Sequence, residues 1–113
     1  MQEKKNVSMS DAQIEEVSRL FGILSEGSRL KLLRALMGGS LTVTELMEAT
    51  GMKQGNVSKH LGVLLTVRFV AREREGNFAR YSIADPRLFP LCHLMCERVG
   101  DDARRRHSEL TGG

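Results

Sequence analysis

The chain has 113 residues, of which 41% are hydrophobic and 27% charged, so we expect one soluble globular domain and exclude a disordered chain. The net charge of +3 is mildly basic, and 4 Phe, 1 Tyr and no Trp leave a core of aliphatic side chains. Since no apolar run approaches the roughly 20 residues needed to span a bilayer and no signal peptide opens the chain, we expect a cytoplasmic protein.

The first third of the chain predicts a flexible arm and two helices. Residues 1–9 are charged and should form the arm. Ser10 and Gln13 fit a capping box, and the helix that they begin should end near Leu24. A second helix at 29–37 has leucines on several sides, which predicts a central, mostly buried position. The first helix has a wide apolar stripe, which either faces a partner in part or packs wholly inside: Ile14, Val17, Leu20, Phe21 and Leu24.

Residues 41–65 predict a short strand followed by two helices and a tight turn. The strand is the β-prone segment 41–43. We expect Thr44 to cap a helix that runs to about Ala49 and stops at Gly51, which can adopt the left-handed conformation. The next helix, 54–65, has apolar side chains at i, i+4, i+7 and i+8, which form one helical face. These side chains are Val57, Leu61, Leu64 and Leu65.

The opposite face of the 54–65 helix has hydrogen-bonding and cationic side chains but no acidic one. Such a face suits the edges of bases and the phosphates beside them. We therefore interpret residues 41–65 as a helix-turn-helix whose second helix enters the major groove. An ordinary helical hairpin with its polar face in water is the alternative. The predicted base and phosphate contacts are Gln54, Asn56, Ser58, Lys59 and His60.

After Leu65 the hydrophobic period changes from 3.6 to 2, which predicts a β-hairpin. Its strands should be 69–74 and 78–83, joined by a turn at 75–77. A hairpin that directly follows a recognition helix is a wing, which would lie along the DNA backbone or in the minor groove. Residues 53–81 hold six Lys or Arg and two Glu, a net charge of +4, which indicates a polyanionic partner. The predicted wing contacts are Arg72, Arg74, Asn77 and Arg80.

A final helix is predicted at 90–107, with Pro90 in its first turn and a tail at 108–113. Its first half is apolar on almost all sides, which implies burial against a second subunit. Residues 10–107 should therefore form one domain of the mainly α class with a β-hairpin wing, which dimerises through its first and last helices.

These motifs, in this order, resemble the ArsR/SmtB family. Residues 24–33 resemble the opening helix pattern of that family, residues 44–46 and 56–61 resemble its helix-turn-helix, and residues 69–83 resemble its wing. The resemblance implies a winged helix-turn-helix of order α-α-(β)-α-α-β-β-α in a homodimeric bacterial repressor, which an inducer releases from its operator. Two-fold symmetry predicts an inverted-repeat operator in double-stranded DNA.

The chain also departs from the family pattern. Lys53 stands where the family commonly caps the recognition helix with Ser or Thr, Gly62 is unusual within that helix, and 67–68 is Val-Arg where Ala-Gly is frequent. The Cys-x-Cys metal site of the family has no counterpart at 45–49, and the spacing of its Asp, His and Glu site is not matched.

Two thiols remain as a candidate sensor. Cys92 and Cys96 stand at positions i and i+4, so they lie on one helical face and could share a soft ion such as arsenite or antimonite. A third ligand would come from His93, the other subunit or a small thiol. Thiol redox or sulfur sensing is a second interpretation, and inert packing is a third. In a cytoplasmic protein both cysteines should be thiols rather than a structural disulfide.

The sequence thus favours a DNA-binding transcriptional repressor that requires no cofactor. An enzyme is not expected, because the chain has no Gly-rich phosphate loop and no nucleophile motif. A winged helix that binds proteins instead of DNA is the remaining alternative, and the basic segment 53–81 argues against it.

Overall fold

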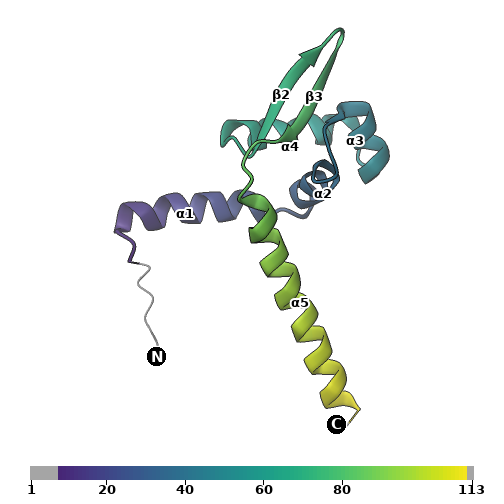
Figure 1. Ribbon diagram of the computed structural model, residues 1–113. Helices are drawn as coiled ribbons and strands as arrows, with labels where there is room; N and C mark the ends of the chain where they lie inside the picture. Colours follow the sequence, from purple (N-terminus) through teal and green to yellow (C-terminus); the bar gives the residue numbers. More distant parts are fainter. Residues whose placement is uncertain (1–7, 112–113) are drawn as a thin grey trace.

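The computed structural model describes residues 8–111 and has the predicted element order. Figure 1 shows a body made of the central helices and a β-hairpin, from which two further helices project. None of the described helices is long and apolar enough to cross a membrane. The elements are α1 (Asp11–Leu24), α2 (Gly27–Leu36), β1 (Leu41–Thr42), α3 (Val43–Thr50), α4 (Gln54–Thr66), β2 (Val70–Glu75), β3 (Phe78–Ile83) and α5 (Leu88–Leu110).

The core lies between α2, α3, α4 and the base of the hairpin. Its side chains are aliphatic apart from two aromatic rings, as the composition predicts, and fully burying each contributes roughly 1.5–3 kcal/mol. The prediction that α2 is central is confirmed, because three of its leucines are among the buried residues. The core residues are Leu32, Leu33, Leu36, Leu46, Val57, Leu61, Leu64, Phe69, Val70, Tyr81 and Leu88.

The sheet has the order β1-β3-β2, and all its pairs are antiparallel. Leu41 of β1 pairs with Tyr81 of β3, and Val70 of β2 pairs with Ile83. The turn of the hairpin is the pair 76–77 rather than the predicted 75–77. Gly76 alone takes the left-handed conformation there, with φ of 62°.

Arg68, at the junction of α4 and β2, has φ of 63°. Among the described residues it is the one non-glycine residue with positive φ, at a position where the resembling family often has Gly. An L-residue in this conformation costs roughly 1–2 kcal/mol, so the backbone at Arg68 is strained.

The cap of α3 is Thr42, so the prediction of Thr44 is wrong. The Thr42 Oγ1 atom accepts a hydrogen bond from the Glu45 backbone N–H at 3.2 Å, and the Glu45 carboxylate accepts one from the Thr42 N–H at 2.9 Å. The last residue of β1 therefore also caps α3, which removes any loop between them. At the other end the prediction is confirmed: Gly51 has φ of 74° and ends the helix.

The helices α1 and α5 project from the body, and little of their apolar surface is covered by the rest of the chain. The predicted capping box of Ser10 and Gln13 begins α1, yet no residue of α1 is buried. α5 projects from the body, and Leu88 is its one buried residue within the described chain. Pro90 lies in the first turn of α5, as predicted. The helix continues to Leu110, so residues 108–110 are helical and not tail; residues 1–7 of the predicted arm lie outside the described chain.

The capping box gives a test of how α3 begins. Thr42→Ala removes the acceptor for the Glu45 N–H, and we expect the free energy of unfolding to fall by about 1 kcal/mol in urea denaturation. Thr44→Ala is the matched control, because Thr44 is exposed and its side chain makes no hydrogen bond to another residue of the 8–111 range. Its change should stay within about 0.5 kcal/mol. An equal loss for both variants would show that Thr42 is not the cap.

Candidate nucleic-acid interface

The outward face of α4 is polar and free of acidic groups. Val57, Leu61 and Leu64 are buried and hold the other face of the helix against the core. No side chain of the outward set makes a hydrogen bond or ion pair to another residue in the described part of the chain, so these groups are available to a ligand. The set consists of Gln54, Asn56, Ser58 and Lys59, which are all exposed.

The first turn of α4 is also open to an anion. Lys53 occupies the N-cap position and supplies no side-chain hydrogen bond to the helix. The first N–H groups of the helix therefore lack a side-chain acceptor, and they carry the positive end of the helix dipole. A lysine at this position adds positive charge where Ser or Thr would have satisfied the backbone, which favours a phosphate there.

His60 does not belong to the outward face, and the prediction that it does is wrong. Its side chain is 6% exposed, and its Nδ1 atom accepts a hydrogen bond from the Arg29 Nε atom at 3.2 Å. Burial lowers the pKa of His60, the charges of Lys59 and Arg29 lower it further, and Glu26 opposes them. The imidazole is therefore part of the packing between α4 and α2.

The hairpin places two arginines on the side that faces the body. Arg72 pairs with Tyr81 and Arg74 pairs with Ala79, and residues directly opposite each other share one face of a sheet. Because Tyr81 and Val70 on this face are buried, Arg72 and Arg74 extend the same face beyond the core. Both are exposed and have no ion-pair partner among residues 8–111. Asn77 is exposed in the turn at the end of the hairpin.

Arg80 lies on the opposite face of the hairpin and has acidic partners. Its Nε atom donates to the Glu75 carboxylate at 2.7 Å, and its Nη1 atom lies 3.6 Å from the Glu45 carboxylate. Nη1 also donates to the Ser40 carbonyl at 3.3 Å. The hydrogen bond to Glu75, followed by the charges of Glu75 and Glu45, raises the pKa of Arg80. Arg80 was expected to be free to bind DNA, but its guanidinium instead links β3 to β2 and to the start of α3.

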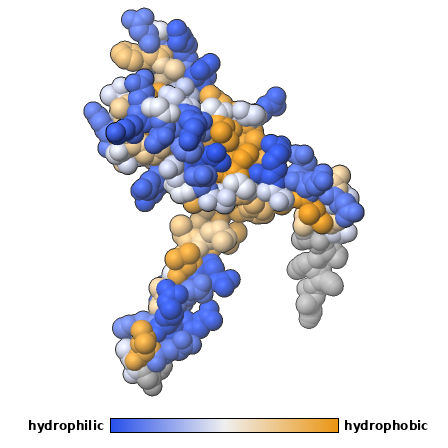
Figure 2. Space-filling model, turned by 180° about the vertical axis from the view of Figure 1, so that it is seen from behind, coloured by the Kyte–Doolittle hydropathy of each residue, from blue (hydrophilic) through white to orange (hydrophobic). Residues whose placement is uncertain are grey.

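An apolar groove lies between α1, α2 and α5. Figure 2 shows hydrophobic side chains gathered where the body meets the projecting helices. The groove has a volume of about 520 Å³. It is lined by Phe21, Leu24, Ser25, Leu30, Lys31, Leu33, Arg34, Met37, Leu91, Cys92, Met95 and Cys96.

The two thiols line this groove. Cys92 is partly buried and Cys96 exposed, and neither is in a disulfide. Burial, followed by the neighbouring Cys96, raises the pKa of the Cys92 thiol. Within residues 8–111 no group of three or more His, Cys, Asp or Glu side chains could hold a metal ion. His93 forms no such group with the two thiols, and its Nε2 atom lies 3.3 Å from the Glu97 Oε2 atom.

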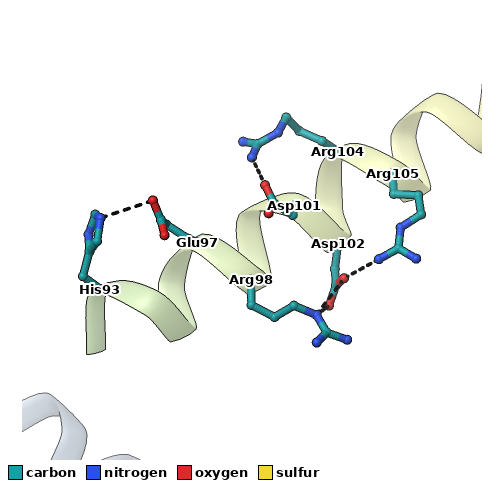
Figure 3. Close-up of polar contacts among 7 residues, drawn as sticks. All are labelled: His93, Glu97, Arg98, Asp101, Asp102, Arg104 and Arg105. Carbon is teal, nitrogen blue, oxygen red and sulfur yellow. Dashed lines mark hydrogen bonds and ion pairs between the residues drawn. The ribbon is translucent and has the colours of Figure 1, made fainter. Parts of the chain in front are cut away.

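The second half of α5 is stabilised by charged pairs within the helix (Figure 3). Asp102 accepts hydrogen bonds from Arg98 at 3.0 Å and from Arg105 at 2.8 Å, and Asp101 pairs with Arg104. Each such exposed pair contributes only a few tenths of a kcal/mol. Arg104 and Arg105 are therefore paired within the helix and belong to its solvent-exposed surface.

The known proteins that resemble this chain are bacterial transcriptional regulators. Residues 26–72 match the model of the arsR family of bacterial regulatory proteins. The chain is 36% identical over 89 residues to a protein of Streptomyces lividans named "Probable mercury resistance operon repressor", a match that covers 79% of this chain and 71% of that protein.

Two solved structures have the same architecture. The antimony-specific transcriptional repressor AntR is 34% identical, with a TM-score of 0.77, and the match covers 88% of this chain and 90% of that chain. A homodimeric winged helix-turn-helix DNA-binding domain from Mycobacterium bovis is 30% identical, with a TM-score of 0.71, over 86% of this chain and 95% of that one.

Proposed function

The chain belongs to the arsR family of bacterial regulatory proteins, and we propose that it is a homodimeric repressor that reads operator DNA with α4. It is a transcriptional regulator and not an enzyme. The observation that carries the proposal is the exposed face of α4, which has four unpaired polar side chains and no acidic one. The chemistry of these side chains matches base edges and phosphates.

The proposed DNA contacts divide between two elements. On α4, Gln54 and Asn56 suit adenine, to which an amide side chain can make two hydrogen bonds, and Lys59 suits guanine or a phosphate. Ser58 lies beside them. On the hairpin, Arg72, Arg74 and Asn77 would bind the backbone or the minor groove. His60 and Arg80 act inside the fold, so we assign them no direct contact.

The proposed dimer joins α1 and α5 of two chains. Both helices expose large apolar side chains that a soluble monomer would have to leave in water, and the similar M. bovis domain is homodimeric. On α5, Cys92, Met95 and Val99 follow one another at spacings of three and four, which places them on one face. A two-fold dimer would bind an inverted repeat whose half-sites lie about one helical turn, or a multiple of it, apart.

We further propose that the inducer is a thiophilic ion, such as arsenite, antimonite or a mercuric ion, held by Cys92 and Cys96. The names of two similar proteins refer to mercury and to antimony, and both elements bind thiolates. The described chain supplies two thiols, so a third ligand would come from the partner subunit or from a small thiol. Thiol oxidation is the second candidate signal, because Cys96 is exposed.

The DNA contacts are tested by a gel shift against the promoter region upstream of the protein's own gene. Asn56→Ala should reduce discrimination between bases by about 1–3 kcal/mol in each half-site, and Lys59→Ala, which removes one cation from each subunit of the dimer, should reduce the slope of log affinity against log salt by about 1.8. Arg106→Ala, an exposed charge change near the end of α5, is the control and should leave both unchanged. Micromolar binding without sequence preference, unaffected by either variant, would disprove DNA reading by α4.

The dimer is tested by placing a charge on the proposed seam. Val99→Glu should give a monomer in analytical ultracentrifugation while the helical circular dichroism is retained, because Val99 is exposed in the single chain. Leu110→Glu is the control at the end of the same helix and should remain dimeric. A dimer that persists in Val99→Glu would place the interface elsewhere.

The sensor is tested by removing both thiols. In the Cys92→Ser, Cys96→Ser double variant, DNA binding should persist, whereas release by arsenite, antimonite or mercuric salts should be lost. Loss of the response to oxidants alone would favour redox sensing. Unchanged release by every agent would assign both cysteines to packing.

A further inference from the structure

One arginine connects the end of α1 to the middle of the recognition helix. Arg29, in α2, donates from Nη1 to the Ile23 carbonyl at 3.2 Å and from Nε to the His60 Nδ1 atom at 3.2 Å. Ile23 lies in the last turn of α1, and His60 lies between exposed Lys59 and buried Leu61 on α4. A single side chain thus fixes α4 relative to α1 through two directional bonds.

This connection determines the protonation state of the imidazole. A guanidinium has only donors and keeps its charge at every pH that a folded protein tolerates. The Nδ1 atom of His60 must therefore present a lone pair, and its ring carries the proton on Nε2. A second proton would have to bind Nδ1, where the Arg29 N–H already points, so protonation and the connection exclude each other.

The charged groups around His60 favour the neutral ring. Arg29 of α2 and Lys59 of α4 are cationic, and only Glu26, which precedes α2, is anionic. Together with burial they keep the pKa of His60 below its ordinary value of 6.5. The connection is consequently complete above about pH 6.5 and is lost as the pH falls through the lower pKa of the folded state.

The far end of the connection lies beside the groove that contains the thiols. Ile23 directly precedes Leu24 and Ser25, which line the groove together with Cys92 and Cys96. A change in the packing of that groove therefore acts on the same helix end that Arg29 holds.

We infer that Arg29 and His60 are positioning residues for the recognition helix: Arg29 holds α4 against the end of α1 in the orientation that reads DNA, and it does so only while His60 is neutral. The inference rests on the proposed function for its DNA readout. Its first test does not need DNA.

The first test is long-range ¹H–¹⁵N NMR of the histidines in the wild-type protein. We expect the His60 ring to carry its proton on Nε2, with Nδ1 unprotonated, and to titrate below 6.5. In the Arg29→Lys variant a single ammonium replaces the guanidinium and cannot reach both the His60 Nδ1 atom and the Ile23 carbonyl. The His60 ring should then no longer be fixed in one tautomer. A proton on Nδ1, or titration at 6.5 or above, would overturn the inference even if the protein binds DNA.

The second test compares DNA affinity across pH, with a duplex of the upstream promoter region as the probe. His60→Asn retains an acceptor, because the Asn Oδ1 atom is as many bonds from the backbone as Nδ1, and it cannot titrate. At about pH 7.5 it should bind like the wild type, whereas His60→Ala and Arg29→Ala should bind about tenfold more weakly. As the pH falls through the pKa that the NMR titration gives for His60, the wild type should weaken more than His60→Asn.

His93 and His107 are present in every variant, so their protonation cancels in the comparison. Equal affinity of all variants at neutral pH, or identical pH profiles for the wild type and His60→Asn, would show that the connection does not position α4. A wild-type protein that fails to bind any promoter fragment would refute the proposed function, while the NMR titration would still decide the state of His60.

Discussion

Val57, Leu61 and Leu64 of α4 are buried in the core, and their burial decides which other side chains of the helix reach solvent. Because three fully buried apolar side chains contribute several kcal/mol, the helix cannot rotate to exchange its faces. Gln54, Asn56 and Lys59 are exposed as a direct consequence. The position of the proposed DNA interface therefore depends on core packing.

Arginine has two different uses in this chain, and the register of the hairpin separates them. Arg72 and Arg74 lie on one face without acidic partners, while Arg80 lies on the other, between Glu75 and Glu45. A shift of one residue in the strand pairing would exchange the two faces, so Arg80 would no longer lie beside Glu75 and Glu45. The net charge of 53–81 overstates the charge available to DNA, since part of it is neutralised within the fold.

Regular periodicity was sufficient to predict the architecture. The 3.6-residue period placed α4 within one residue of its observed end, and the change to a period of 2 located both strands of the hairpin. Contacts between distant residues were beyond this reasoning. His60 is polar, which favours the polar face, yet it lies three residues after Val57 and four before Leu64, which is the spacing of the buried face. Only its partner Arg29, 31 residues away, has no local signal. Arg80 pairs with Glu75 across the turn of the hairpin and with Glu45 of α3, and only the second of these partners is distant in the sequence.

The proposed sensor and the proposed dimer depend on each other. The described chain offers two thiols on a helix whose apolar face is uncovered, and a soft ion with three ligands would need one more donor. If the partner supplies that donor, binding cannot occur without altering how two copies of α5 meet. Because α5 and the end of α1 border one groove, and Arg29 ties that end to α4, a change at the thiols has a short physical route to the reading helices.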